Sequence, residues 1–218
     1  VMAALRLTLP DLPAPAGGKM AAELRVLGRG PVLAALALTV IGSSAMFTVF
    51  TYIAPILREQ THASLAFVTA MLVTYGLGLT LGNWLGGRFA DKSVDRTLIV
   101  TLAGLSAILA VFAFAMPFAV PTSILIFLWG VASFALVPPL QVRVMAAAAD
   151  APNLASSMNI GAFNLGNAVG AALGGAVIAG GLGYPAVSVA GAVAAALGLV
   201  LVLVLTRRPA AAGSAVSG

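Results

Sequence analysis

Long apolar runs separated by short polar turns dominate the sequence. Six of the runs reach the roughly 20 residues that a helix needs to cross about 30 Å of hydrocarbon. Because lipid offers the backbone no hydrogen-bond partners, an open chain crosses it only as a helix. The expected spans are Val32–Leu57, Ser64–Ala90, Thr97–Met116, Thr122–Ala148, Leu154–Gly180 and Tyr184–Thr206. The pattern therefore predicts an all-α membrane protein with six transmembrane helices.

The segments that flank these spans predict a simple domain organisation. Residues 1–31 are expected to hold the end of a preceding span, followed by a cytoplasmic linker between two halves of a longer protein. Within that linker, residues 19–29 alternate charged and apolar positions, which suits either a short amphipathic surface helix or a solvated connection. Residues 32–206 then form the six-helix domain, and residues 207–218 a cytoplasmic tail.

The distribution of Lys and Arg predicts the orientation. Only Arg58 falls on one side of the predicted spans, whereas nine basic residues fall on the other. These nine are Lys19, Arg25, Arg29, Arg88, Lys92, Arg96, Arg143, Arg207 and Arg208. Basic residues collect in cytoplasmic loops. With an even number of spans, both ends of the segment are therefore expected in the cytoplasm.

Polar residues inside the spans follow a repeated order. The first and second spans carry several hydroxyl and amide residues and the third few; the fourth and fifth are again polar, and the sixth is apolar. A unit of three spans is odd, so the second unit must be inverted relative to the first. Inverted three-helix repeats are typical of secondary transporters.

Several residues inside the spans are candidates for a substrate cavity. Ser44, Thr48, Thr51 and Pro55 follow a helical spacing and form one polar stripe, and Pro138-Pro139 should kink the fourth span. Bonding of these hydroxyls to their own helix is the alternative. Asn164 and Asn167 share a face and could line a cavity or join helices. The aromatic candidates, which could instead be ordinary core, are Tyr75, Trp129, Phe134 and Phe163.

Glycines and charged residues supply two further groups. Gly166, Gly170 and Gly174 recur every four residues and are expected to pack closely against a neighbouring helix. Gly82, Gly86 and Gly87, which precede the charged turn, are likewise expected to let a neighbouring helix approach closely. The charged turn after the second span, together with two later charges, is expected to act in gating. These gating candidates are Gly87, Arg88, Asp91, Lys92, Arg96, Arg143 and Asp150. Asp91 is expected to latch the inward side of the bundle in one state, by accepting from a neighbouring helix N-terminus or by pairing with Arg88 or Arg143. The alternative is a solvated surface acid.

Composition removes several other classes of protein. The chain is 61% hydrophobic and 8% charged, against roughly 25% charged residues in soluble domains. Its net charge of +5 is not gathered into a basic cluster with aromatics, so we expect no nucleic-acid partner. Cysteine is absent and His62 is the single histidine, so no disulfide, metal or other cofactor is expected. Without protease, Walker or dinucleotide motifs, the sequence does not indicate an enzyme.

Particular motifs carry a family resemblance. Gly87-Arg88-Phe89-Ala90-Asp91-Lys92 is similar to the second copy of the loop motif GxxxD(R/K)xGR, although Val94 replaces the motif's second glycine and Asp95 the next basic residue. Further similar blocks are residues 139–143, 150–157 and 162–167. On these blocks, essentially the whole chain resembles the C-terminal half of a major facilitator superfamily transporter of the drug:proton antiporter branch.

The resemblance implies a function and a location. It implies a secondary active transporter in a bacterial inner membrane that exports drugs or sugar- and nucleoside-like molecules by alternating access. The first, second, fourth and fifth spans would line the cavity, and the third and sixth would face lipid. Expected partners are a small-molecule substrate, the lipid bilayer, and protons through the absent N-terminal half, because no predicted span carries a charge at mid-depth. The alternative is a non-transporting six-span scaffold or partner subunit.

Overall fold

The computed structural model describes residues 25–207, and it places them in helices that follow one another with short turns. Two pairs of helices, α3 with α4 and α7 with α8, each continue along one span. The helices are α3 (Gly30–Phe50), α4 (Ile53–Gln60), α5 (Leu65–Ala90), α6 (Val94–Ala115), α7 (Ala119–Ala135), α8 (Val137–Ala147), α9 (Pro152–Ala179) and α10 (Gly183–Arg207). Residues 208–218 of the expected tail, and residues 1–24 with the expected end of a preceding span, lie outside the described residues.

Within residues 25–207, six stretches are long and apolar enough to cross a membrane, so the prediction of six spans there is confirmed. Their ends differ from the predicted ones by a few residues, for local reasons. The third span begins at Val94 rather than Thr97, because Ser93 caps α6 by accepting a hydrogen bond from the Arg96 backbone N–H at 3.3 Å. Pro152 occupies the first turn of α9, where its missing N–H costs no hydrogen bond.

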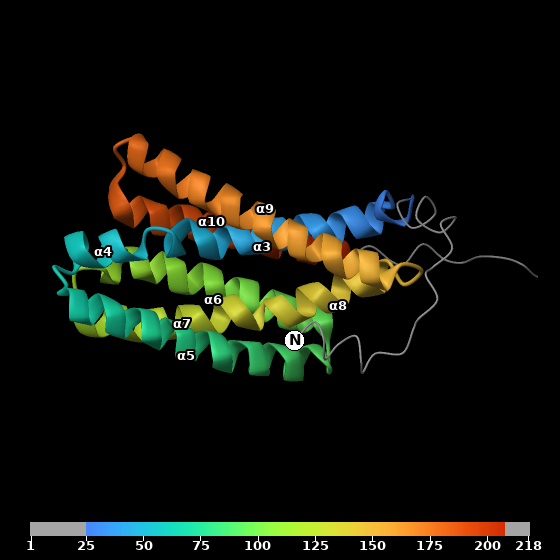
Figure 1. The fold of residues 1–218 in the computed structure, drawn as a ribbon, viewed down its shortest axis with the longest axis horizontal. Coiled ribbons are helices and arrows are strands. Elements are labelled where there is room, and N and C mark those ends of the chain that lie inside the picture. The colour runs from blue at the N-terminus through green and yellow to red at the C-terminus, as the bar shows by residue number, and fades with distance from the viewer. Residues whose placement is uncertain (1–24, 208–218) are drawn as a thin grey trace, which may run out of the picture.

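The helices form two groups of three spans, seen as the upper and lower parts of Figure 1. One group packs α3 against α9 and α10, and the other packs α7 against α5 and α6. If the first, second and third spans change places with the fourth, fifth and sixth, one group becomes the other. The two groups also contact each other, through α6 and α10. The packing therefore has the symmetry of an inverted repeat, as the alternation of polarity predicts.

Apolar side chains fill the space between the two groups. The large core takes residues from α3, α5, α6, α7 and α10, with Leu105, Phe112 and Trp129 almost fully buried. A smaller core lies where the start of α3 meets α8 and the turn before α9, around Val32 and Val144. The large core thus joins the two groups, and the smaller one adds apolar contacts at the end where α3 and α9 begin.

Two helices are poorly covered by the rest of the chain. Within their most apolar stretches, α5 buries 28% and α9 buries 22% of its residues, the lowest shares of the six spans. These helices lie on the outside of the two groups in Figure 1. Most of their surface is therefore free to face lipid or another protein.

Candidate functional site

Prolines break the first and the fourth span at related places. Pro55 has no N–H to bond the carbonyl of Thr51, and α3 ends at Phe50 before α4 resumes at Ile53. Pro138 and Pro139 have the same effect on the fourth span, which is interrupted at Leu136 between α7 and α8. The kink predicted at Pro138-Pro139 is present, and the break before Pro55 is its counterpart in the first repeat.

Two glycine series mark the closest helix crossings. Gly166, Gly170 and Gly174 of α9 lie against α3, where a Cβ on Gly170 would stand 2.5 Å from the carbonyl oxygen of Ser44. We call this contact the α3–α9 crossing. Gly78, Gly82 and Gly86 of α5 lie in the same way against α7 and its end, and a Cβ on Gly78 would stand 2.5 Å from the Phe127 oxygen. We call this second contact the α5–α7 crossing. The close approach predicted at Gly82 and Gly86 is confirmed, whereas a Cβ on Gly87 would meet nothing within 4 Å, and Gly78 is an addition that the sequence did not indicate.

The hydroxyl stripe of the first span lies partly inside the α3–α9 crossing. Ser44 and Thr48 are buried there, and each donates a hydrogen bond to its own helix, to the Ile41 and Ser44 carbonyls at 2.8 and 2.7 Å. Thr51 is exposed at the helix break and donates to the Phe47 carbonyl at 2.8 Å. Of the three, only Thr51 presents its side chain to the outside of the described chain.

Aromatic residues gather where α3, α5, α6 and α7 meet. Tyr75 lies 4.6 Å from Trp129 between ring centroids, and Phe50 and Phe112 pack against the same pair. The Nε1 atom of Trp129 is buried and has no hydrogen-bond partner among the described residues. The cluster thus combines aromatic rings with a buried indole N–H that has no partner among the described residues.

Of the remaining aromatic and amide candidates, Phe163 is linked to that cluster through Phe47, which packs on Phe50. Phe163 of α9 packs edge-on against Phe47 of α3 at 6.1 Å, and Phe134 is half-buried near the end of α7. Asn164 is exposed, whereas the Oδ1 atom of Asn167 is buried without a partner in the described chain. The structure therefore brings Tyr75 and Trp129 together but leaves the two asparagines on another helix.

A buried amide network that the candidate residues did not include joins α3, α8 and α9. Thr39 donates to Oδ1 of Asn159 at 2.7 Å, and Nδ2 of Asn159 donates to Oε1 of Gln141 at 2.6 Å. The Gln141 amide in turn donates to Ser156 at 2.7 Å. The signal in the sequence was the presence of amides in apolar spans, but their pairing depends on which helices become neighbours.

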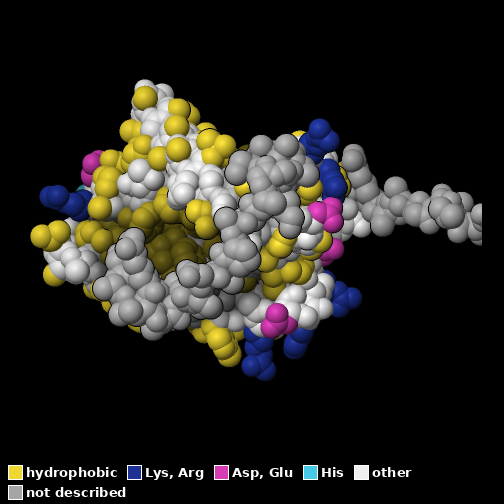
Figure 2. Space-filling view, turned by 45° about the vertical axis from the view of Figure 1, so that its right-hand side comes forward, with side chains coloured by type: hydrophobic (Ala, Val, Ile, Leu, Met, Phe, Trp, Pro, Cys, Tyr) yellow, Lys and Arg dark blue, Asp and Glu magenta, His cyan; other side chains and the backbone are white. Residues whose placement is uncertain are grey.

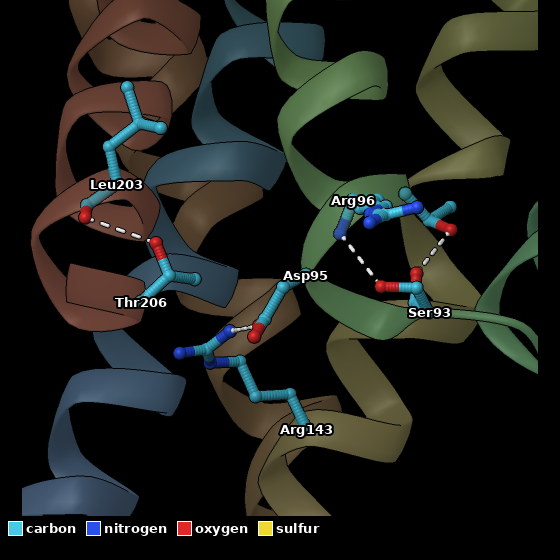
Figure 3. A network of polar contacts seen from close by, with 7 residues as sticks. Ser93, Asp95, Arg96, Arg143, Leu203 and Thr206 are labelled. Carbon is cyan, nitrogen blue, oxygen red and sulfur yellow. Dashed lines mark hydrogen bonds and ion pairs between the residues drawn. The ribbon is translucent and has the colours of Figure 1, made fainter. Parts of the chain in front are cut away.

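Charged residues cluster at the α5–α6 end of the bundle, and Figure 2 shows most Lys and Arg side chains toward its right and lower edges. Arg143 of α8 pairs with Asp95 of α6, as Figure 3 shows, and not with Asp91. Asp91 is exposed and forms no ion pair with any described residue; its backbone N–H closes the end of α5. Its proposed role as a latch stays a prediction.

Among the other gating candidates, two lie near aromatic rings and one forms a second ion pair. Arg88 stands 5.6 Å from the Trp84 ring centre, and Lys92 stands 5.9 Å from that of Phe89. Gly87 is half-buried on α5, and Arg96 is exposed on α6. Asp150, before α9, pairs with Arg29 at 2.7 Å, although both side chains are more than half exposed. This second pair connects the beginning of α3 to the α8–α9 turn.

Known proteins are similar to this chain over most of its length. Residues 33–218 match the family model described as Major Facilitator Superfamily. The chain belongs to that superfamily. Its motifs, six spans and inverted repeat agree with half of the superfamily's fold.

Individual relatives support the assignment. The chain is 51% identical over 211 residues to "Inner membrane transport protein YdhP" of Escherichia coli (strain K12), covering 95% of this chain and 53% of that protein. It is 35% identical over 179 residues to "Uncharacterized MFS-type transporter YfhI" of Bacillus subtilis (strain 168), covering 82% and 45%. It is 31% identical over 167 residues to a "Probable sugar efflux transporter" of Haemophilus influenzae (strain PittGG), covering 76% and 42%. The chain thus spans about half the length of the relatives that it matches.

Proposed function

We propose that this chain forms one half of a secondary active transporter that exports small molecules by alternating access. A second six-helix unit would complete the path. The observation that carries this proposal is the pair of matched three-span groups, each with one glycine-lined crossing and one span broken by proline. Transporters built from inverted repeats work by rocking such groups around a site near the middle of the membrane, and broken helices commonly form that site.

The surface of α5 and α9 supports a second unit. Polar residues exposed within these helices include Thr69, Thr80, Asn83, Ser157 and Asn164. An amide in contact with hydrocarbon loses its hydrogen bonds with water, and polar residues in spans usually face protein or a water-filled cavity. Asn83 and Asn164 therefore suit a wall that faces the partner unit across the translocation path.

The residues of this half favour a neutral or amphipathic substrate. In the described spans, the cavity candidates offer hydroxyls, amides and aromatic rings, and the carboxylates Glu59, Asp91, Asp95 and Asp150 lie at span ends or in turns. A sugar-like or drug-like molecule suits such a wall, and the name of the Haemophilus relative agrees with the first. We place substrate contact at Thr51 and Asn164, which are exposed in the described chain.

Coupling to protons belongs, in this proposal, to the second unit. A coupling carboxylate needs enough shielding from water for its pKa to change with conformation, and the turns of this half do not supply that shielding. We further propose a bacterial inner membrane location, with both ends of the six-span domain in the cytoplasm. The asymmetry of Lys and Arg supports that orientation.

Reconstituted vesicles test the proposal. The chain is inserted alone, or together with the part of the E. coli relative to which it does not align, and export of labelled sugars and drugs is followed with and without a pH gradient. We expect gradient-driven export only with both parts, and a loss of about tenfold or more for Asn164→Leu at unchanged insertion. Impermeant thiol labelling of intact cells should reach Gln60→Cys and miss Ser93→Cys.

Two results would contradict the proposal. Gradient-driven export by the chain alone would refute both the half-transporter assignment and the location of coupling. An inserted and assembled pair that moves none of the compounds would favour the scaffold alternative.

A further inference from the structure

A pocket lies on the outside of the bundle, where α5 ends and α6 begins. Its volume is about 350 Å³, within the range of roughly 300–1,000 Å³ that is usual for ligand sites. The lining residues are Phe89, Lys92, Ser93, Arg96, Thr97, Val100 and Thr101. Phe89 and Val100 are 48% and 69% exposed, so the pocket opens outward, away from the residues assigned to the substrate path.

The polar lining of this pocket consists mainly of two cations. The hydroxyls of Thr97 and Thr101 donate to the carbonyls of Ser93 and Thr97, each at 2.7 Å, so their hydrogen atoms are already used. Ser93 is occupied as the cap of α6. What remains available for a ligand is an apolar wall with Lys92 and Arg96 at one end.

These two cations are not neutralised by a carboxylate in the described chain. Asp95 is next to Arg96 in sequence, but Figure 3 shows it directed toward Arg143, on the other side of the helix from Arg96. Asp91 forms no ion pair with a described residue. The α6 N-terminus adds a partial positive charge to the same place.

Neighbouring aromatics indicate the depth of the pocket in the bilayer. Trp84 is 58% exposed on α5, and aromatic residues with nearby cations are typical of the level of the lipid headgroups. Arg96 and Val100 lie one turn apart on α6, about 6 Å along its axis. The cationic end of the pocket is therefore at headgroup depth, and its apolar end reaches the beginning of the acyl chains.

We propose that this pocket binds an anionic phospholipid of the adjoining leaflet, such as phosphatidylglycerol. Lys92 and Arg96 hold the phosphate, and Phe89 and Val100 contact the first part of an acyl chain. A zwitterionic lipid carries its own cation close to the phosphate, which the two basic side chains repel. Selection for net negative charge follows from that arrangement.

Fluorescence quenching tests this site in the purified chain, reconstituted in phosphatidylcholine. The reporter is the tryptophan of Trp84→Phe/Phe89→Trp, because position 89 lines the pocket and Trp84 does not. Phosphatidylglycerol brominated near the headgroup end of its acyl chains is added, and quenching of this tryptophan is measured; the remaining tryptophan, Trp129, is 1% exposed and serves as background. We expect half-quenching at a much lower fraction than with brominated phosphatidylcholine. In Lys92→Gln/Arg96→Gln the preference should fall about tenfold or more, the scale of two lost cations near an anionic surface.

Matched variants decide between binding at this pocket and general attraction. Arg25→Gln/Arg207→Gln removes the same charge from exposed residues outside the pocket and should keep the preference. Val100→Phe narrows the apolar end without a change of charge and should weaken binding. Equal quenching by both lipids, or the same loss in the control pair, would overturn the proposal. So would displacement of the lipid by millimolar inorganic phosphate, which would indicate a site for free anions.

Discussion

The α5–α7 and α3–α9 crossings hold equivalent places in the two repeats but differ in chemistry. At the α5–α7 crossing, three glycines meet backbone atoms of the opposite helix, and Gly130 on that helix returns the contact toward the Tyr75 carbonyl. At the α3–α9 crossing, Gly170 likewise meets backbone, but Gly166 and Gly174 also meet the side chains of Ser43 and Tyr52. One crossing is thus backbone against backbone, and the other includes hydroxyl groups.

The difference shows which property the repeats share and which they do not. Close approach is common to both, because glycine lets the helix axes come together in lipid, where packing and not the hydrophobic effect drives association. The buried amide network beside Asn159 accompanies only the α3–α9 crossing. We infer that side-chain hydrogen bonds set the partner and register of α9, whereas shape alone sets those of α5.

The largest expected effect comes from adding one methyl group to either crossing. A Cβ on Gly82 would overlap the Val131 carbonyl, and one on Gly170 would overlap that of Ser44. Backbone cannot move aside as a side chain can, so Gly82→Ala and Gly170→Ala should each lower the free energy of unfolding by about 1–3 kcal/mol. Thermal unfolding in detergent measures this, with Gly87→Ala as control because a Cβ there meets nothing within 4 Å. A large difference between the two would mean that only one crossing is tightly packed.

A smaller effect should distinguish the α3–α9 crossing, which includes hydroxyl groups, from the α5–α7 crossing. Asn159→Leu leaves Thr39 and Gln141 without their buried partner, and we expect it to cost about 1–2 kcal/mol in the same unfolding measurement. Asn83→Leu on α5 replaces an exposed amide and should change stability by less than about 0.5 kcal/mol. Similar losses of stability in the two leucine variants would show that the amide network does not stabilise the α3–α9 crossing.

The smallest effect is expected from a single hydroxyl at the same crossing. The Tyr52 hydroxyl donates to the Ala171 carbonyl at 2.8 Å from a half-buried position. Tyr52→Phe should cost about 0.6 kcal/mol, the average found for hydrogen bonds between membrane helices. A cost above that of Asn159→Leu would show that this one bond, and not the amide network, holds α9.

Sequence reasoning reached the spans because a membrane restricts the backbone so strongly. Apolar length alone placed all six, and the break at Pro138-Pro139 follows from proline chemistry. Pro55 carries the same chemistry but was read only as part of a polar stripe. Close approach of a neighbouring helix was predicted at Gly82, Gly86 and Gly87; the structure confirms it at the first two and adds Gly78, four residues before Gly82.

The candidate site was less accessible to such reasoning, because it depends on which helices become neighbours. Nothing in the spacing of Asn159 and Gln141 shows that Thr39, 120 residues from Asn159, completes their network. Asp91 ends α5 and Asp95 begins α6, only four residues later. Which of the two carboxylates meets Arg143 depends on how α6 packs against α8, and the residue spacing does not show that packing. Tyr75 and Trp129 share a cluster for the same reason.

The back-bonded hydroxyls of α3 bear on how the protein is made. Ribosomes add about 5–20 residues each second, so the 120 residues between Thr39 and Asn159 separate their synthesis by roughly 6–24 s. During that interval α3 is inserted without α9. Ser43, Ser44 and Thr48 each donate to their own helix, so these three hydroxyls need no partner while α3 waits in lipid. Because these hydroxyls are bonded to their own helix, they need not exchange partners when the glycines of α9 later pack against α3.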